Sequence, residues 1–182
     1  RRTNEGHIFY SVACTGENLL YDAGKRTLPL SLRERAKVIR EKAHQDFYSG
    51  FTRGVSFLES AWYAYGKGEI ELTAFMLQQA AELPLRSILL ALTGQDLHSH
   101  SISKLCSCCR RCAPQLSELF PRDTVTGRRL LNLLDSAYIH ARYRELAILE
   151  KTDIILLFEK IKAMHLAARQ LFEEKLAAFS CK

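Results

Sequence analysis

The sequence predicts a mainly α-helical protein, an antiparallel helical bundle of about five helices with a β-hairpin remnant at its N-terminus. Three observations predict this fold class. Residues 74–94 are apolar around nearly the whole circumference of a helix, which is typical of a helix in the middle of a bundle. Apolar stripes at helical spacing recur before and after it, joined by short polar loops. Strand composition, rich in aromatic and branched side chains, is confined to residues 7–21.

The N-terminal segment predicts two short strands, residues 7–14 and 19–21, around a turn at 15–18. An isolated hairpin is only marginally stable in water, so we expect the other strands of its sheet to lie upstream of this chain. The chain begins without Met and without an apolar signal region. We therefore expect a piece of a longer, non-secreted, cytoplasmic protein.

The first long helix is predicted from about residue 31 to residue 65. Ser31 and Glu34 have the spacing of a capping box, in which the serine hydroxyl and the carboxylate satisfy backbone N–H groups at a helix start. Because glycine is a poor helix former, we expect the helix to break near Gly50 and Gly54.

The central helix is predicted from about residue 69 to residue 93 and should be the most buried of all. Pro84 lies inside it, where it removes the hydrogen bond to the carbonyl of Ala80 and should kink the helix. Gly94 is the expected stop.

Three further helices complete the bundle. The first of them is expected at about 101–119, with an interruption at Pro114, and the others at about 127–143 and 152–179. His165 falls on the apolar face of the last helix. A single histidine on such a face is more often a hydrogen-bonded core residue than a ligand or a base, so we expect the former.

Charge and composition exclude several classes of protein. The formal net charge is +6, but residues 25–53 hold eight Lys and Arg against three acids, so the excess is local and not spread over a nucleic-acid-binding face. No apolar run reaches the roughly 18 residues of a membrane span, and we expect no membrane partner. At 182 residues the chain is long enough for one domain with an appendage.

A polar stripe crosses the otherwise apolar central helix. Gln78, Glu82 and Arg86 follow one another at four-residue intervals, with Gln79 beside them. Glu82 precedes Arg86 in the order that favours a helix ion pair. Unpaired polar groups in a core cost about 1–3 kcal/mol each. The stripe must therefore either face solvent or line a polar pocket.

Three motifs in order resemble the HEPN domain family. The central helix contains Gln79-Ala-Ala-Glu82 with a basic residue at Arg86, the next helix opens with His100-Ser-Ile, and Ala141-Arg-Tyr143 ends the following long helix. These resemble the family's Q-A-A-E-x-x-x-K, H-x-L and A-R-Y-P patterns over about residues 47–180, with Arg86, Ile102 and Arg144 in place of the Lys, Leu and Pro. The resemblance implies a helical bundle that binds a nucleotide, and HEPN relatives commonly form homodimers.

A cysteine cluster lies in the third predicted helix, at Cys106, Cys108, Cys109 and Cys112. A closed zinc site needs four convergent ligands, usually from two segments, so His98 or His100 would have to complete this one. The family resemblance instead places Cys106 and Cys109 at core positions, where buried cysteine behaves as a small apolar residue. We expect packing, with no metal and no cofactor.

A second resemblance concerns the N-terminal residues. Residues 6–24, ending in Glu17-Asn-Leu-Leu-Tyr-Asp22, resemble the last strands of the minimal nucleotidyltransferase domain that often precedes a HEPN domain. The carboxylates that bind metal in that domain would lie upstream, so this chain is not expected to transfer nucleotides. The resemblance divides the chain into a hairpin at 1–28, a basic helical linker at 29–50 and the HEPN-type bundle at 51–182.

Active HEPN ribonucleases carry an arginine, four to six residues, and then a histidine, which cleave RNA by acid–base chemistry. From residue 26 onward no arginine in this chain has a histidine at that spacing. Arg1 and Arg2 precede His7 at an acceptable spacing, but they lie in the strand segment outside the bundle. We therefore expect no catalytic residues in this chain.

Two candidate positions remain open between a structural and a binding role. His100 either caps the third predicted helix or bonds a neighbouring backbone group, or it stands where a ligand enters the end of the bundle. Tyr138 and Arg142 share one face of a helix with Tyr143 beside them, which suits a phosphate or a nucleobase, and equally suits a surface cation–π pair.

The resulting prediction is a non-catalytic HEPN-type domain that binds a nucleotide or the acceptor substrate of a fused nucleotidyltransferase. The alternatives are a toxin-type HEPN ribonuclease with non-standard residues and a structural dimerisation module. A homodimer is expected, and the expected partners are the ligand and the preceding transferase domain. Two arginines converging on the site would favour a phosphate-bearing ligand. The predicted ligand-binding residues are Gln78, Glu82, Arg86, His100, Tyr138, Arg142 and Tyr143.

Overall fold

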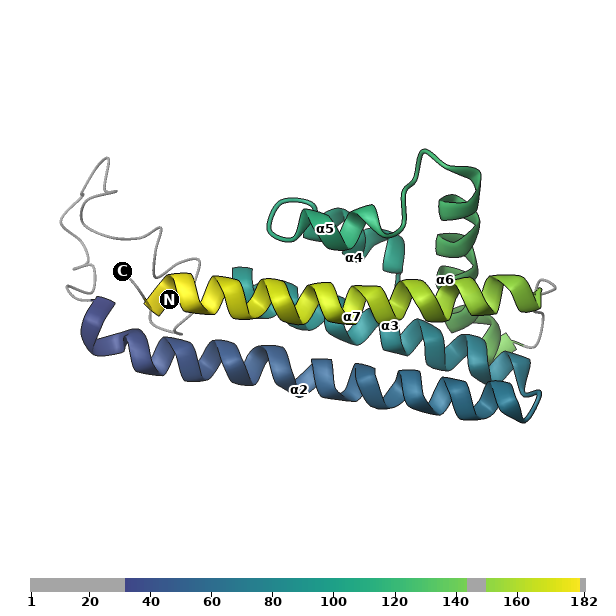
Figure 1. Cartoon of the computed structure of the whole chain (residues 1–182), viewed down its shortest axis with the longest axis horizontal. Helices are drawn as coiled ribbons and strands as arrows, with labels where there is room; N and C mark the ends of the chain where they lie inside the picture. The colour runs from purple at the N-terminus through teal and green to yellow at the C-terminus, as the bar shows by residue number, and fades with distance from the viewer. Residues whose placement is uncertain (1–31, 144–149, 181–182) are drawn as a thin grey trace.

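The computed structural model describes residues 32–143 and 150–180. Six helices occupy nearly all of this part of the chain, and no strand occurs within it, which confirms a mainly α-helical protein (Figure 1). The expected hairpin at residues 7–21 lies outside the described residues. The helices are α2 (Leu32–Gly66), α3 (Ile70–Thr93), α4 (Ile102–Cys109), α5 (Pro114–Glu118), α6 (Val125–Tyr143) and α7 (Lys151–Ser180).

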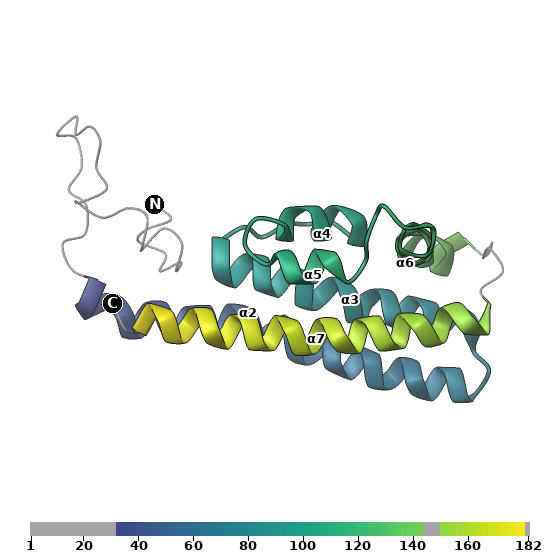
Figure 2. The ribbon, with the colours of Figure 1, turned by 45° about the horizontal axis from the view of Figure 1, so that its top comes forward.

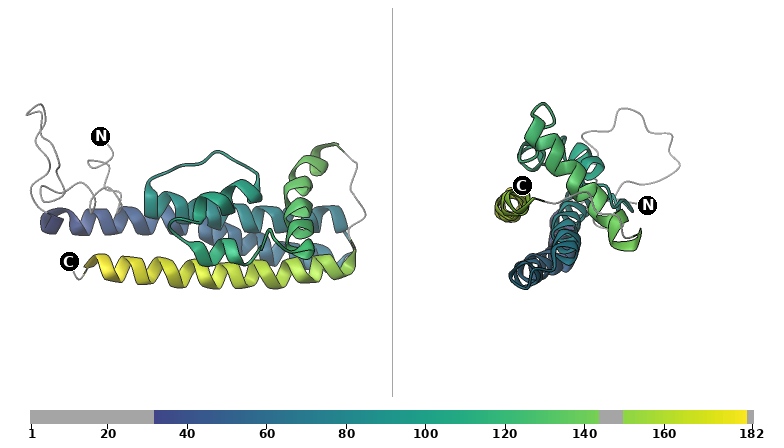
Figure 3. Two further views of the ribbon diagram at one scale, coloured as in Figure 1. Left: turned by 90° about the horizontal axis from the view of Figure 1, so that it is seen from above. Right: turned by 90° about the vertical axis from the view of Figure 1, so that its right-hand side faces the viewer.

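The three long helices α2, α3 and α7 lie side by side. Helices α3 and α7 run in the same direction, and α2 runs opposite to both (Figure 1). The shorter helices α4 and α5 lie on the side of α3 that faces away from α2, as the tilted view shows (Figure 2). Seen end-on, α3 lies between α2 on one side and α4 to α6 on the other, with α7 alongside (Figure 3). This arrangement explains why α3 is apolar around nearly its whole circumference.

Burial confirms that α3 is the central helix. Fourteen of its 24 residues are buried, against 11 of the 28 residues of α7 whose burial is described. The helix ends where the sequence predicted, because Gly94 adopts a left-handed conformation with φ 68° and its N–H bonds to the carbonyl of Leu90.

The expected break in α2 near Gly50 and Gly54 is wrong, because the helix continues through both glycines. Their role is close approach to α3. A Cβ added at Gly54 would lie 2.6 Å from ring carbons of Pro84, and one at Gly50 would lie 2.1 Å from the hydroxyl of Ser87. Glycine lowers the intrinsic helix propensity here, but the packing of two helices across these positions outweighs that penalty.

Pro84 leaves the carbonyl of Ala80 without its usual helical partner, since proline has no N–H. His165 of α7 takes that place, with its Nε2 2.8 Å from the Ala80 oxygen. His165 is buried and its ring lies beside Phe51 of α2. The expectation of a hydrogen-bonded core histidine is confirmed.

The predicted helix at 101–119 is interrupted at Pro114 as expected, and forms α4 and α5. Two features differ from the antiparallel bundle that the sequence predicted: α3 and α7 are parallel to each other, and α6 crosses the long helices and does not run along them (Figure 1). Leu130, Leu131 and Leu134 of α6 are buried in the core. These leucines cover a part of the apolar surface of α3 that the other helices leave exposed.

An ion pair ties α6 to the start of α7. A guanidinium nitrogen of Arg129 lies 2.5 Å from Oδ1 of Asp153, whose side chain is only 3% exposed. The N–H is not aligned with that oxygen, which accepts no hydrogen bond from any group in the described part of the chain. The contact is therefore coulombic, and it neutralises a buried carboxylate.

The two ends of the described chain meet in the core. The rings of Phe47 in α2 and Phe172 in α7 stack with centroids 4.2 Å apart, and Ile39 and Ala43 are buried on the same side of α2 as Phe47. The expected division of the chain at residue 50 stays a prediction. Within the described residues, no helix has the length and apolar character needed to cross a membrane.

Candidate functional site

The carboxylate of Glu82 is the centre of a buried polar cluster on α3. Its side chain is 2% exposed. Gln78 Nε2 donates to it at 2.9 Å and Gln79 Nε2 at 3.3 Å, while Arg86 donates at 3.3 Å. The Nδ1 of His100 lies 3.1 Å from both carboxylate oxygens. A carboxylate is an acceptor only, so four donors converging on it satisfy the group fully.

The inner part of the predicted polar stripe is buried, and its partner is the loop of residues 94–101. Gln78 also donates to the backbone carbonyl of His100 at 2.9 Å, so one amide group contacts both Glu82 and the loop. The carboxylate and the amide of α3 together hold the loop against the helix.

The outer edge of the cluster reaches the surface at Arg86. Its guanidinium lies 3.3 Å from a carboxylate oxygen of Asp96 and 3.5 Å from Nδ1 of His98. The Arg86 side chain is 25% exposed, that of Asp96 54% and that of His98 81%. The cluster is thus buried at Glu82, whereas its outer residues, at Arg86 and in the loop, are at least partly exposed to solvent.

The loop is fixed at its end by a capping network at the start of α4. Ser101 is the N-cap residue and its hydroxyl accepts from the N–H of Lys104. Asp135 of α6 accepts from the N–H of Ile102 at 2.5 Å and from the Ser101 hydroxyl at 3.2 Å. The reading of His100 as a helix cap is wrong, because its ring is held by Glu82 and the capping group is the next residue.

The structure brings together four of the seven predicted ligand-binding residues. Gln78, Glu82, Arg86 and His100 form one cluster. The backbone of the other three lies in the last turns of α6, but the side chains of Tyr138, Arg142 and Tyr143 lie outside the described residues.

The sequence did not predict that three further residues contact the cluster or the helix start beside it. Asp96 and His98 lie in the loop, where their alternation with apolar Leu97 was the available signal, and Asp135 interrupts the apolar face of α6. A local pattern marks these residues as polar but does not say which helix they contact.

The cysteines pack as the sequence predicted at two positions. Cys106 and Cys109 are 2% and 0% exposed. Burial raises the pKa of Cys106 to about 12 and raises that of Cys109 further, so both thiols stay protonated at neutral pH. Burial also raises the pKa of the Cys112 thiol. Among the described residues, no three His, Cys, Asp or Glu side chains are grouped so that they could hold a metal ion.

The chain was also compared with models of known protein families. The HEPN domain model matches residues 50–171, which is more than half of the chain. The chain therefore belongs to the HEPN domain family. A search of curated proteins found no match.

Proposed function

We propose that this HEPN domain binds a nucleotide at the surface edge of the Glu82 cluster and does not itself cleave RNA. The observation that carries the proposal is the placement of Arg86. Its guanidinium is held from behind by buried Glu82 and is shared at the surface with Asp96, beside two imidazoles. A positioned guanidinium with a solvated side is the group that binds phosphate through paired hydrogen bonds.

The outer ion pair is the one that a ligand phosphate would replace. The Arg86–Asp96 contact is 3.3 Å long and Asp96 is 54% exposed, and such surface pairs contribute only about 0–1 kcal/mol. The inner pair with Glu82 stays in place and keeps the guanidinium oriented. Arg142 and Tyr143, in the last turn of α6, would add a second cation and a ring for the nucleobase.

Asp96→Asn provides a direct test. The substitution keeps the size of the side chain and removes the charge that competes with a phosphate. We expect ATP and GTP to bind more tightly to this variant in isothermal titration calorimetry. Glu41→Gln, which neutralises an exposed carboxylate in the N-terminal half of α2, should leave the affinity unchanged. Unchanged or weaker nucleotide binding by Asp96→Asn contradicts the proposal.

The same variant separates a nucleotide from the other predicted ligand class. A cationic, hydroxyl-rich acceptor such as an aminoglycoside would use the Asp96 carboxylate, so its binding should weaken in Asp96→Asn. Arg142→Ala adds a further check. Loss of stability with unchanged nucleotide affinity would assign Arg142 to a structural ion-pair network and remove it from the site.

One observation favours a second candidate, a ribonuclease with non-standard residues. His100 is oriented by a buried carboxylate, and Arg86 contacts His98 although the two residues lack the sequence spacing of active HEPN ribonucleases. Cleavage of single-stranded RNA in the presence of a chelator, lost in both His98→Asn and His100→Asn, would establish it. Absence of cleavage would exclude this candidate.

The oligomeric state and the neighbouring domain belong to the same proposal. We expect a homodimer that acts beside a nucleotidyltransferase domain, because HEPN relatives dimerise and because residues 6–24 resemble the end of that transferase. Light scattering over a concentration series checks the first point, and a monomer at every concentration contradicts it.

A further inference from the structure

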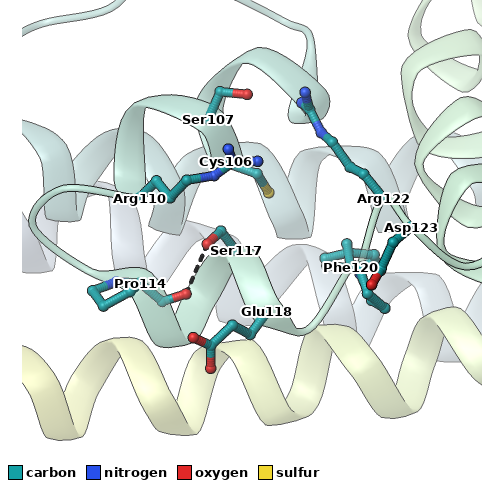
Figure 4. A pocket seen from close by; sticks show the side chains of 10 residues that line it. Cys106, Ser107, Arg110, Pro114, Ser117, Glu118, Phe120, Arg122 and Asp123 are labelled. Atoms are coloured by element: carbon teal, nitrogen blue, oxygen red, sulfur yellow. Dashed lines mark hydrogen bonds between the residues drawn. The ribbon is translucent and has the colours of Figure 1, made fainter.

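A cavity lies between α4, α5 and the loop of residues 119–124, and none of its lining residues belongs to the Glu82 cluster. It has a volume of about 340 Å³, which is the size of a small ligand site. Figure 4 shows its lining from close by. The residues that matter for its chemistry are Cys106, Arg110, Ser117, Glu118, Phe120 and Arg122.

The floor of this pocket is apolar and uncharged. Cys106 is 2% exposed and Phe120 is 1% exposed, so both belong to the core beneath the pocket. Because burial raises the pKa of Cys106 to about 12, its thiol is neutral and adds no negative charge. The floor can therefore contact an apolar or aromatic group of a ligand.

The two cationic side chains of the pocket lie on its α4 side. Arg122 donates through Nη2 to the backbone carbonyl of Ser103 in α4, which holds its guanidinium there. The close-up shows the guanidinium of Arg110 directed toward Cys106, whereas the carboxylate of Glu118 lies near α7 (Figure 4). The cations and Glu118 are thus on opposite sides of the opening.

These charges are not neutralised by each other. Among the described residues, Arg110, Arg122, Glu118 and Asp123 take part in no ion pair. Residues 101–130 contain six Lys and Arg against two acids, and one of those arginines, Arg129, is occupied by Asp153. The remaining excess makes the local field positive and attracts anions.

We propose that this pocket binds a small organic anion, a molecule with one phosphate or carboxylate group and a compact apolar or aromatic body. Arg110 and Arg122 bind the anionic group, and Phe120 with Cys106 contacts the body. The Ser117 hydroxyl donates to the carbonyl of Pro114, so its oxygen is left to accept a hydrogen bond from the body of the ligand (Figure 4). This site is separate from the nucleotide site proposed at Arg86.

Phenyl phosphate and benzoate are suitable probes, because they share a ring and differ in the anionic group. We expect saturable binding of at least one of them to the whole chain in calorimetry, with amide NMR shifts at Ser107, Arg110 and Ser117. Tighter binding of phenyl phosphate indicates a phosphate-bearing ligand, and tighter binding of benzoate a carboxylate. Binding of neither probe at roughly 10 mM overturns the proposal.

Arg110→Gln should weaken binding roughly tenfold, since a charged hydrogen bond is lost. Arg111→Gln is the matched control, because Arg111 is the next residue, carries the same charge, is exposed and does not line the pocket. Equal weakening in both variants would show attraction to a general positive surface and would overturn the site.

Two further variants keep the test independent of folding and of the first site. Glu118→Gln removes the opposing carboxylate and should tighten binding of either probe, and an unchanged affinity counts against the site. Arg86→Gln should leave probe binding unchanged while it weakens ATP. If Arg86→Gln abolishes probe binding, the probe occupies the Glu82 cluster and the separate pocket is disproved.

Discussion

The imidazole of His165 donates its Nε2 hydrogen to the backbone carbonyl of Ala80 at 2.8 Å. A carbonyl oxygen can only accept, so this contact requires the tautomer with the proton on Nε2. The carbonyl is available because Pro84, four residues on, has no N–H to offer it. A defect in α3 and a polar residue in the core of α7 thus compensate each other.

This compensation predicts a coupling between positions 84 and 165. His165→Leu leaves the buried Ala80 carbonyl without a partner and should lower the free energy of unfolding by about 1–3 kcal/mol. In a Pro84→Ala background the alanine N–H can bond to Ala80, so the same substitution should cost less. Urea denaturation of the two single variants and the double variant measures the difference. Equal losses of unfolding free energy in the two backgrounds would show that His165 does not stabilise the protein through the Ala80 carbonyl.

The buried imidazole also predicts a pH dependence of stability. Burial lowers the pKa of His165 from its ordinary value of 6.5. Above pH 6.5 the ring is neutral in both states and its contribution is complete. Below it the unfolded chain binds a proton that the folded protein excludes, so stability falls by up to about 1.4 kcal/mol per pH unit until the folded pKa is reached.

His165→Gln is the matched variant for this measurement, because it keeps a donor for Ala80 and cannot titrate. The difference in unfolding free energy between the wild type and His165→Gln should shrink as the pH falls from 7.5 to 5.5. Parallel pH profiles would rule out a role for this residue in the dependence.

The contact between α2 and α3 predicts opposite effects for two glycines. Gly54→Ala places a Cβ 2.6 Å from the ring of Pro84, and the overpacking should lower stability by about 1–3 kcal/mol despite the better helix propensity of alanine. Gly66→Ala meets no atom within 4 Å and should be neutral or slightly stabilising. Thermal unfolding of both variants decides the matter, and equal midpoints would contradict the close approach.

Removing the charge of Glu82 should destabilise the cluster even though the shape is kept. In Glu82→Gln an amide NH₂ replaces one carboxylate oxygen and faces the donors of Gln78, Arg86 and His100. We expect a loss of about 1–3 kcal/mol from unpaired buried donors. Hydrogen exchange should show faster opening of the loop at residues 94–101, while α7 exchanges as before. A variant as stable as the wild type would mean that the carboxylate is not needed for folding.

The Arg129–Asp153 pair predicts a rescue. Arg129→Met leaves a carboxylate that is 3% exposed without its counter-charge and should cost about 1–3 kcal/mol, because the arginine itself is half exposed and part of its effect is screened. Adding Asp153→Asn removes the unpaired charge and should restore most of the loss. Chemical denaturation of the single and double variants tests this, and additive losses would contradict an ion pair.

The sequence predicted the helices well because their signals are local. The all-round apolar pattern of residues 74–94 identified the central helix, and Pro114 marked the gap between α4 and α5. The break assigned to Gly50 and Gly54 failed for the opposite reason. Glycine weakens a helix in isolation, but here the missing side chains admit Pro84 and Ser87 of α3, which is information that only the packed structure contains.

The candidate site was predicted in part. Period and polarity identified Gln78, Glu82 and Arg86 as one stripe, and the family motif added His100. The predicted site joined the stripe to Tyr138, Arg142 and Tyr143 of α6, whereas the described contacts come from the loop before α4. A helix carries its own periodicity in the sequence, but the loop that folds back over it has no periodicity from which its path can be read.

The stacked rings of Phe47 and Phe172 lie just outside the matched family region, one before residue 50 and one after residue 171. A protein trimmed to residues 50–171 would keep the whole region that matches the family model. It would lose both rings of this stack, together with Ile39, Ala43 and Leu176 of the core. The region that matches the family model is therefore shorter than the stretch of chain that contributes to the hydrophobic core. The segments on either side of the matched region pack against each other through this stack. Shortening either segment should therefore expose the core at the same end of the bundle.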